Sequence, residues 1–342
     1  MTTPPIIRNF DDLRGAAAAL PGPDDRAGKA AAEREPKLTK PAGALGRMEA
    51  LAHWLARWQG RHPPTVTTAK AQVFAGNHGV AAKGVSAYPA SVTAQMVRNF
   101  ETGGAAINQL CRAFGVGFAV DAMALDKPTA DFTQGPAMTE AECVDAFVFG
   151  MGRVADGIDV LCLGEMGIGN TTSAAALAMG LFGGGARDWT GAGTGVSGRR
   201  LKQKTDAVAA AVGLHRAELA CPFEALRRLG GRELAAIAGA VLAARFRRVP
   251  VVLDGYAATA AAAVLHAAAP GGLDHCQVGH LSAEPGHRRL LDHLKMRPIL
   301  DLGMRLGEAT GAVLALQVVK GAAACHAGMA TFDEAGVSGK DG

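Results

Sequence analysis

The chain is poor in aromatic and charged residues. Of its 342 residues, 5% are aromatic and 19% are charged, whereas 49% are hydrophobic. This balance excludes an intrinsically disordered chain, which needs the opposite composition. The formal net charge is only +4, from 35 basic and 31 acidic residues. Arg245, Arg247 and Arg248 are the densest basic group, and they do not form a run of five. A nucleic-acid-binding protein is therefore not predicted.

Cysteines and long apolar segments are also scarce. The six cysteines are scattered and none forms a CxxC pair, and a chain of this size can bury a core without disulfides. We predict reduced cysteines in a cytoplasmic protein. The most apolar stretch, residues 256–265, is mostly alanine and far shorter than the roughly 20 residues of a membrane span. The N-terminus, with Pro4, Pro5 and Asp11, does not have the pattern of a signal peptide.

Glycine, in contrast, is abundant, with 45 residues clustered between short apolar runs. These runs predict strands at residues 71–76, 115–120, 158–163 and 249–253, and a weaker strand leading into residues 277–280. They lack polar alternation, which is typical of strands covered on both faces. Helical spacing between them, as in residues 233–245, predicts an α/β fold: a Rossmann-like, mostly parallel sheet flanked by helices.

The chain ends differ from this core. Residues 46–60 place Met48, Leu51, Leu55 and Trp58 at helical spacing, and Pro63 then breaks the pattern. We predict three regions: a small helical region at residues 1–70, an α/β core at 71–300, and a catalytic loop, C-terminal helix and tail at 301–342. Residues 333–342 are predicted to form a loose tail.

Polar residues follow each predicted strand. Because the carboxyl ends of parallel strands border the ligand crevice, these tips predict one site at that edge of the sheet. The residues that follow the strands are Asn77 and His78, Asp121, Gly164 and Glu165, Asp254 and Gly255, and His280 with Ser282.

Residues 164–172, GEMGIGNTT, join a strand to a helix. Glycines and a helix N-terminus can cradle a phosphate or carboxylate, whereas Asn170, Thr171 and Thr172 can equally serve as helix caps. No GK[ST] follows, which excludes a Walker A loop. Glu165 would repel a phosphate, so we expect it to face a sugar or a base.

Residues 193–198, GTGVSG, match GxGxxG only formally, because the preceding segment is a poor strand and Glu218, twenty residues on, lies in a helical stretch. A second anion-binding turn with Lys202 or Lys204 is the better interpretation. His280 and His287, with Asp254 or His78, could be metal ligands, but no dense ligand spacing supports this. Hydrogen-bonded histidines and no metal site are predicted.

Glu308 lies in an apolar setting within ILDLGMRLGEATGAVLAL. Burial would raise its pKa and make it a general base near neutrality, although the following helix start would favour the anion. A salt bridge to Arg305 or a first-turn helical glutamate are the plain alternatives. Tyr88 and Pro89, followed by Val92, Met96 and Val97, could form an apolar wall for an aromatic ligand, or could simply belong to the core.

Six segments together resemble the nicotinate-nucleotide–dimethylbenzimidazole phosphoribosyltransferase family. They are KPAGALGRME, GNHGV with GVSAYPASVTAQM, GEMGIGNTT, LDGYAAT, GHLSAEPGH and LDLGMRLGEATGA, in the order of the family and over most of the chain. The resemblance implies a Rossmann-like sheet, a smaller helical domain from the chain ends, and a homodimer. It implies transfer of 5-phosphoribosyl from nicotinate mononucleotide to a benzimidazole-type base in cobalamin biosynthesis, without a cofactor.

The resemblance also implies roles for individual residues. Glu308 matches the catalytic base. The implied substrate-binding residues are Tyr88, Pro89, Gln95 and Met96 at the base, Glu165 near the ribose and nicotinate, Gly167, Ile168, Gly169, Asn170, Gly193, Lys204 and Ser282 at the phosphate, and Leu306. Ala309 stands where the family often has glycine, and Tyr88 and Met96 stand where some members have Ser and Gln, which bears on the choice of base. A nicotinamide-dinucleotide-dependent oxidoreductase and a non-catalytic nucleotide-binding protein are the alternative functions.

Overall fold

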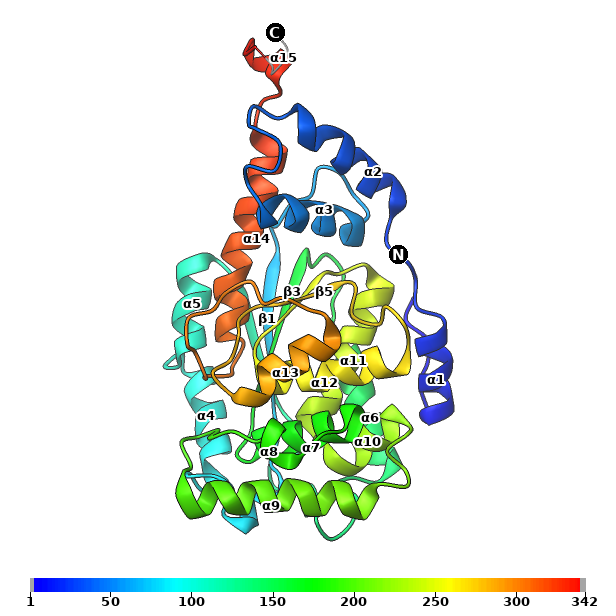
Figure 1. Cartoon of the computed structure of the whole chain (residues 1–342), viewed down its shortest axis with the longest axis vertical. Helices are drawn as coiled ribbons and strands as arrows, with labels where there is room; N and C mark the ends of the chain where they lie inside the picture. Colours follow the sequence, from blue (N-terminus) through cyan, green and yellow to red (C-terminus); the bar gives the residue numbers. More distant parts are fainter. Residues whose placement is uncertain (1–2, 339–342) are drawn as a thin grey trace.

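A five-stranded parallel sheet forms the centre of the protein in a computed structural model that describes residues 3–338 (Figure 1). The strand order is β2-β1-β3-β4-β5, and all four pairings are parallel. The strands are β1 (Ala69–Ala75), β2 (Gly117–Ala122), β3 (Val160–Met166), β4 (Val251–Leu253) and β5 (Cys276–Val278). All five predicted strands are confirmed, each within a few residues of its expected bounds.

Helices cover both faces of this sheet. Side chains alternate along β3, so that Leu161 and Leu163 join one apolar cluster, whereas Val160 and Cys162 join the other. The first cluster includes residues of α6 (Glu140–Met151), α7 (Asn170–Phe182), α9 (Gly198–His215), α10 (Pro222–Leu229), α11 (Arg232–Arg247) and α12 (Tyr256–Ala268). The second includes residues of α3 (Arg47–Gln59), α4 (Ser91–Glu101), α5 (Ala106–Phe114) and α14 (Thr310–Gly328). Burial on both faces explains the absence of polar alternation in β3 and β4, whereas β2, at the edge of the sheet, is only partly buried.

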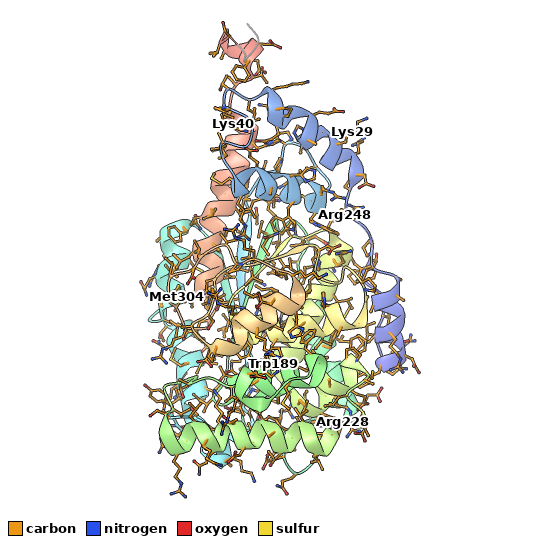
Figure 2. All side chains as sticks on the ribbon, viewed as in Figure 1. Lys29, Lys40, Trp189, Arg228, Arg248 and Met304 are labelled. Atoms are coloured by element: carbon orange, nitrogen blue, oxygen red, sulfur yellow. The ribbon has the colours of Figure 1, made fainter. Side chains whose placement is uncertain are left out.

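Short helices and the remaining segments complete the architecture. They are η1 (Glu35–Lys37), η2 (Gly79–Lys83), α8 (Ala186–Trp189), α13 (Pro285–Leu294) and α15 (Phe332–Ala335). Trp189 of α8, labelled in Figure 2, is fully buried. Its ring stacks on that of His293, with centroids 5.7 Å apart. Part of the predicted loose tail is wrong, because Thr331 and Glu334 form a capping box that starts α15. Residues 339–342 of that tail lie outside the described residues.

The chain ends form the smaller helical domain that the resemblance implied. α2 (Asp25–Arg34) packs on α3, and α3 packs on α14, which runs out from the core beside them (Figure 1). Arg34 donates to the carbonyls of His326 and Met329, which joins the two ends. α1 (Phe10–Ala18) packs on the core instead, where the rings of Phe10 and Phe223 lie 6.2 Å apart. The boundaries 1–70, 71–300 and 301–342 stay a prediction.

Two further sequence features have a clear structural setting. All six cysteines are free, and four of them are buried. Within residues 3–338, α14 alone has the length and apolar composition to cross a membrane, and half of that stretch is buried inside the protein. It packs against α3, α5, β3 and β4, as a core helix does.

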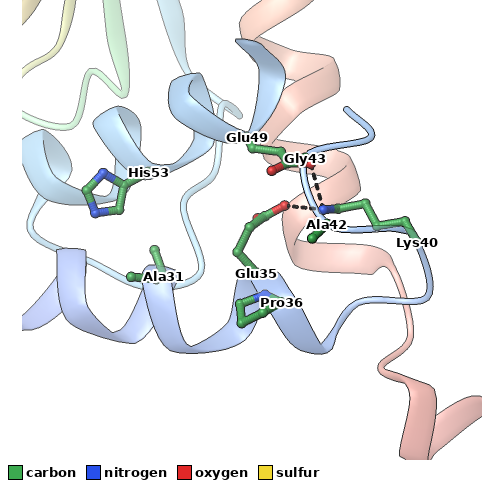
Figure 3. Close-up of a pocket in the computed structure, with 9 residues that line it drawn as sticks. Ala31, Glu35, Pro36, Lys40, Ala42, Gly43, Glu49 and His53 are labelled. Carbon is green, nitrogen blue, oxygen red and sulfur yellow. Dashed lines mark hydrogen bonds and ion pairs between the residues drawn. The ribbon is translucent and has the colours of Figure 1, made fainter. Parts of the chain in front are cut away.

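A cavity of about 310 Å³ lies in the helical domain beside the KPAGALGRME segment (Figure 3). Lys40 Nζ lies 2.9 Å from Glu35 Oε1 and 2.7 Å from Glu49 Oε1, and all three side chains are at least four-fifths buried. Burial lowers the pKa of Lys40, but its hydrogen bonds to Glu49 and Glu35 outweigh this and raise it. The ammonium therefore stays charged and ties η1 to α3.

We expect Lys40→Met to destabilise the protein by about 2 kcal/mol, because two partly buried carboxylates lose their shared partner. Denaturant titration of the purified protein measures this. The matched control is Lys29→Met, because Lys29 lies 3.8 Å from Glu33 on an exposed face of α2 and should contribute almost nothing. Equal effects of the two substitutions would contradict the structural role of Lys40.

Candidate active site

A cavity with convergent polar groups lies at the carboxyl ends of the strands. It has a volume of about 630 Å³, which suits a small-molecule site. The strand order reverses between β1 and β3, and such switch points are where open parallel sheets bind ligands. The lining residues follow four of the strands or lie in the 305–308 segment; they are Tyr88, Val92, Met96, Glu165, Met166, Gly167, Ile168, Asn170, Thr171, Gly193, Thr194, Gly255, Tyr256, Ala257, His280, Ser282, Glu284, Arg305, Leu306, Gly307 and Glu308.

The turn between β3 and α7 borders this cavity. Gly169 has a φ of 96°, and a Cβ on Gly167 would lie 2.6 Å from the carbonyl oxygen of Gly76, so both positions require glycine. The Ile168 N–H donates to Thr93 Oγ1 at 3.1 Å, and the Asn170 N–H donates to the Gly167 carbonyl. These two amides already have acceptors inside the protein. Of the four predicted cradle residues, Gly167, Ile168 and Asn170 line the cavity, and Gly169 does not.

Glu165 extends from β3 into the cavity and is buried. The Asn170 side-chain amide donates to its Oε2. Burial, followed by the negative charges of Asp254 and Glu233, raises the pKa of Glu165 to about 8. The carboxyl is therefore mostly protonated at neutral pH and can donate a hydrogen bond to a sugar hydroxyl or to a carboxylate.

Glu308 lies beside Glu165, just before α14, and its N–H donates to the Glu165 carbonyl at 3.0 Å. It is buried, and burial together with the charge of Asp254 raises its pKa to about 7. Glu308 is not a first-turn helical glutamate, because α14 begins two residues later. The salt bridge to Arg305 is also wrong, because Arg305 donates to the Gly193 carbonyl at 3.1 Å and forms no ion pair with Glu308. Glu308 can accept a proton near neutrality and faces the same space as Glu165.

The GTGVSG segment follows α8, not a strand, which removes the dinucleotide interpretation. Its first amide, Gly193 N–H, donates to Glu284 Oε1 at 2.7 Å. Lys204 lies behind this loop and is outside the cavity lining: its Nζ donates to Thr171 Oγ1 and the Gly191 carbonyl, each at 2.9 Å. Burial lowers the pKa of Lys204 to about 8.

The segment after β5 places His280, Ser282 and Glu284 on the cavity wall. The Ser282 backbone N–H donates to His287 Nδ1 at 2.9 Å, and His287 Nε2 lies 3.2 Å from Thr259 Oγ1. Burial lowers the pKa of His287 to about 3, so this ring is neutral and holds the segment in place. Within residues 3–338, no group of three or more His, Cys, Asp or Glu side chains could hold a metal ion.

An apolar wall completes the cavity. Tyr88, Met96 and Leu306 line it as the sequence suggested, together with Val92 and Met166. Pro89 and Gln95 do not line it, and both are exposed. Tyr88 and Leu306 are exposed at 56% and 46%, so this wall lies at the mouth of the cavity.

Sequence reasoning missed several lining residues, chiefly Thr194, Tyr256, Glu284 and Arg305. Thr194 Oγ1 accepts the Ala87 N–H at 3.0 Å and joins the loop that carries Tyr88 to the GTGVSG loop. Thr194 lies in GTGVSG and Glu284 lies in GHLSAEPGH, so their place in these motifs was the sequence feature that could have predicted them as lining residues. Arg305 also lies inside a motif, LDLGMRLGEATGA, but the sequence suggested it only as an ion-pair partner of Glu308.

Known proteins share this sequence and this fold. The profile of the family described as Phosphoribosyltransferase matches residues 20–337. The nicotinate-nucleotide–dimethylbenzimidazole phosphoribosyltransferase of Sinorhizobium medicae is 59% identical over 331 residues, which cover 97% of this chain and 98% of that protein. The protein of the same name from Brucella anthropi is 58% identical over 330 residues, 96% of this chain and 97% of the relative.

A solved structure agrees with these matches. The crystal structure of nicotinate-nucleotide–dimethylbenzimidazole phosphoribosyltransferase from Thermus thermophilus superposes with a TM-score of 0.86 at 42% identity, covering 92% of this chain and 99% of that one. The chain therefore belongs to the nicotinate-nucleotide–dimethylbenzimidazole phosphoribosyltransferase family.

Proposed function

We propose that this protein transfers 5-phosphoribosyl from nicotinate mononucleotide to 5,6-dimethylbenzimidazole or a related base, giving α-ribazole 5′-phosphate and nicotinate. The observation that carries the proposal is a buried carboxylate with a pKa of about 7, Glu308, on the wall of a 630 Å³ cavity in a chain 59% identical to an enzyme of that name. Cobalamin biosynthesis is the process that such a product would serve.

The chemistry needs one base and good alignment. One benzimidazole nitrogen attacks C1′ of the ribose while the bond from C1′ to the pyridinium nitrogen breaks, and that electron pair stays on the departing neutral ring. The proton on the other benzimidazole nitrogen passes to Glu308, which supplies general-base help of about 10²–10⁴-fold. The pyridinium is already cationic and needs no acid, so the remaining acceleration comes from holding the two substrates in line. The anomeric carbon is inverted.

We propose the remaining roles in the same cavity. The phosphate binds near the 167–170 turn, Gly193 and Ser282, with Lys204 supporting that loop from behind. Glu165 lies at the ribose and nicotinate, and Tyr88, Met96 and Leu306 frame the base. Pro89 and Gln95 are exposed and lie outside the cavity lining, so neither is assigned a direct contact with the base. The reaction as written requires no cofactor and no metal.

We also propose that the protein works as a cytoplasmic homodimer that binds neither nucleic acid nor a membrane. Tyr88 and Leu306 are exposed apolar side chains at the mouth of the cavity, and a second chain at this edge would cover them.

A direct assay tests the proposed function. Purified protein is mixed with nicotinate mononucleotide and dimethylbenzimidazole, and mass spectrometry follows nicotinate and the ribazole phosphate. Formation of both in equal amounts supports the transferase. Tight NADH binding without turnover of the mononucleotide would favour an oxidoreductase, and mononucleotide binding without nicotinate release would favour a non-catalytic nucleotide-binding protein.

Ser282→Ala should raise the KM for nicotinate mononucleotide about 5- to 20-fold and leave the KM for the base nearly unchanged. The reason is the loss of one hydroxyl donor to the phosphate, whose hydrogen bond is charge-assisted. Initial rates at varied concentrations of each substrate measure both constants. Thr67→Ala is the control, because Thr67 is exposed beside the amino end of β1, at the opposite edge of the sheet. An unchanged KM for the mononucleotide would remove Ser282 from the phosphate site.

A further inference from the structure

Asp254 lies just beyond β4, between the sheet and the start of α14, and its side chain is fully buried. Its Oδ2 accepts the Ala309 N–H at 3.0 Å, and its Oδ1 accepts the Ala312 N–H at 3.0 Å. The N-cap position of α14 is Ala309, which has no side-chain acceptor for the free amides of the first turn. Asp254 therefore supplies the N-cap of α14 from a different element of the fold.

The amides that Asp254 holds lie directly after Glu308. Glu308 and Ala309 have φ values of 71° and 66°, a left-handed conformation that is costly for residues with a Cβ. The Glu308 N–H donates to the Glu165 carbonyl at 3.0 Å, and the next N–H donates to Asp254. Hydrogen bonds at two consecutive amides thus maintain the strained turn that directs the Glu308 side chain.

His280 faces the other side of Asp254. Its Nε2 lies 3.7 Å from Asp254 Oδ1, and its side chain is almost fully buried. The imidazole fits closely between two glycines: a Cβ on Gly311 would lie 2.0 Å from its Cδ2, and a Cβ on Gly255 would lie 2.8 Å from its Nε2. Burial raises the pKa of Asp254, whereas the charge of His280 and the N–H donors of α14 oppose this rise.

We propose that Asp254 is a positioning residue for Glu308: by capping α14 it holds the turn that presents the Glu308 carboxylate to the substrates. The inference rests on the proposed transferase function and adds a residue that touches neither substrate. Asp254 is outside the cavity lining, so its contribution passes through the backbone of Ala309 and through its charge.

The charge of Asp254 provides a signature that a merely structural role lacks. The titratable groups around it are Glu165 and Cys162 on β3, His280 after β5 and Glu308 before α14. The negative charge of Asp254 raises the pKa of Glu308. Removal of that charge should lower the pKa of Glu308, so the acidic limb of the kcat profile should move to lower pH.

The test compares wild-type protein with Asp254→Asn and Asp254→Ser, which are both neutral and can still accept one N–H. We expect kcat to fall at least 30-fold, the KM for nicotinate mononucleotide to change less than threefold, and the acidic limb of kcat to move down by half a pH unit or more. Asp292→Asn, which removes an exposed carboxylate from α13, should match wild type. Unchanged kcat, or a loss of kcat with an unmoved acidic limb, overturns the inference.

Hydrogen exchange of the wild-type protein gives a result even if both variants fail to fold. The Ala309 and Ala312 amides should exchange as slowly as those in the middle of α14, because they are bonded to a buried carboxylate. Rapid exchange of both amides would overturn the positioning role. Wild-type turnover is measured alongside: its absence would refute the proposed function, whereas normal turnover with failed Asp254 predictions would refute only this inference.

Discussion

Glu308→Gln should lower kcat for ribazole phosphate formation by about 10²–10⁴-fold and leave the KM for nicotinate mononucleotide within about threefold. Glutamine fills the same volume and keeps the polar surface, but it cannot accept the proton that the attacking base must lose. Steady-state rates from nicotinate release measure both constants. Because the pKa of Glu308 is raised to about 7, the wild-type kcat should increase with pH through that value and then level off.

The control for this substitution is Glu101→Gln, which removes a glutamate charge from the exposed last turn of α4, outside the cavity. It should have wild-type kcat and the same pH profile. Wild-type kcat in Glu308→Gln would remove Glu308 from its role as the base. A large loss of mononucleotide binding in that variant would instead assign it to substrate binding.

The same substitution should stabilise the fold in alkaline solution. The native pKa of Glu308, about 7, is above its ordinary value of 4.5, so the native state binds more protons than the unfolded state between these values. Stability contributed by this carboxyl is therefore full below pH 4.5 and decreases as the pH rises through 7. Ionising this carboxyl destabilises the native state by roughly 3 kcal/mol above pH 7. Glu308→Gln avoids most of that cost, so denaturant titration should give a higher free energy of unfolding than wild type at pH 8 and nearly the same value at pH 5.

Most of the secondary structure could be predicted from the sequence, because the local hydrophobic patterns agree with the burial of these residues in the fold. Strands β1 and β3 are mostly buried, contain short apolar runs and are followed by glycines, so both their type and their place in a parallel sheet followed from the sequence. α15 was missed because a short capping box, Thr331 with Glu334, starts a helix within a polar segment. The position of α1 on the core, through Phe10 and Phe223, depends on a contact between residues more than two hundred positions apart.

The site could be predicted only in part, because several of its contacts join residues that are far apart in the sequence. Glu165 and Glu308 stood out because a carboxylate in an apolar segment is costly without a function. The trans cap of α14 by Asp254 and the bond from Gly193 to Glu284 join residues that are 55 and 91 positions apart. No periodicity encodes such pairs. The sequence showed which polar residues follow the strands, but it could not show that Lys204 lies behind its loop and that Gln95 is outside the cavity lining.

Gly164→Ala should remove at least 99% of the activity and destabilise the protein by about 1–3 kcal/mol, a typical cost of overpacking. A Cβ at this position on β3 would lie 2.0 Å from the backbone nitrogen of Ala309 and 2.6 Å from its Cα. These are backbone atoms at the start of α14, so no side-chain rotation relieves the contact. The turn that carries Glu308 must move, and small displacements of a reacting group are costly in rate.

Two measurements separate this effect from general damage. Turnover gives the loss of activity, and denaturant titration shows whether the variant is still folded under assay conditions. The matched control is Gly213→Ala on the exposed side of α9, where an added Cβ meets nothing within 4 Å and should stabilise the helix by about 0.5–1 kcal/mol. If Gly164→Ala retained wild-type kcat, the close approach of β3 to the Glu308 turn would not set the position of the base, and the geometry on which the Glu308 mechanism depends would have to be abandoned.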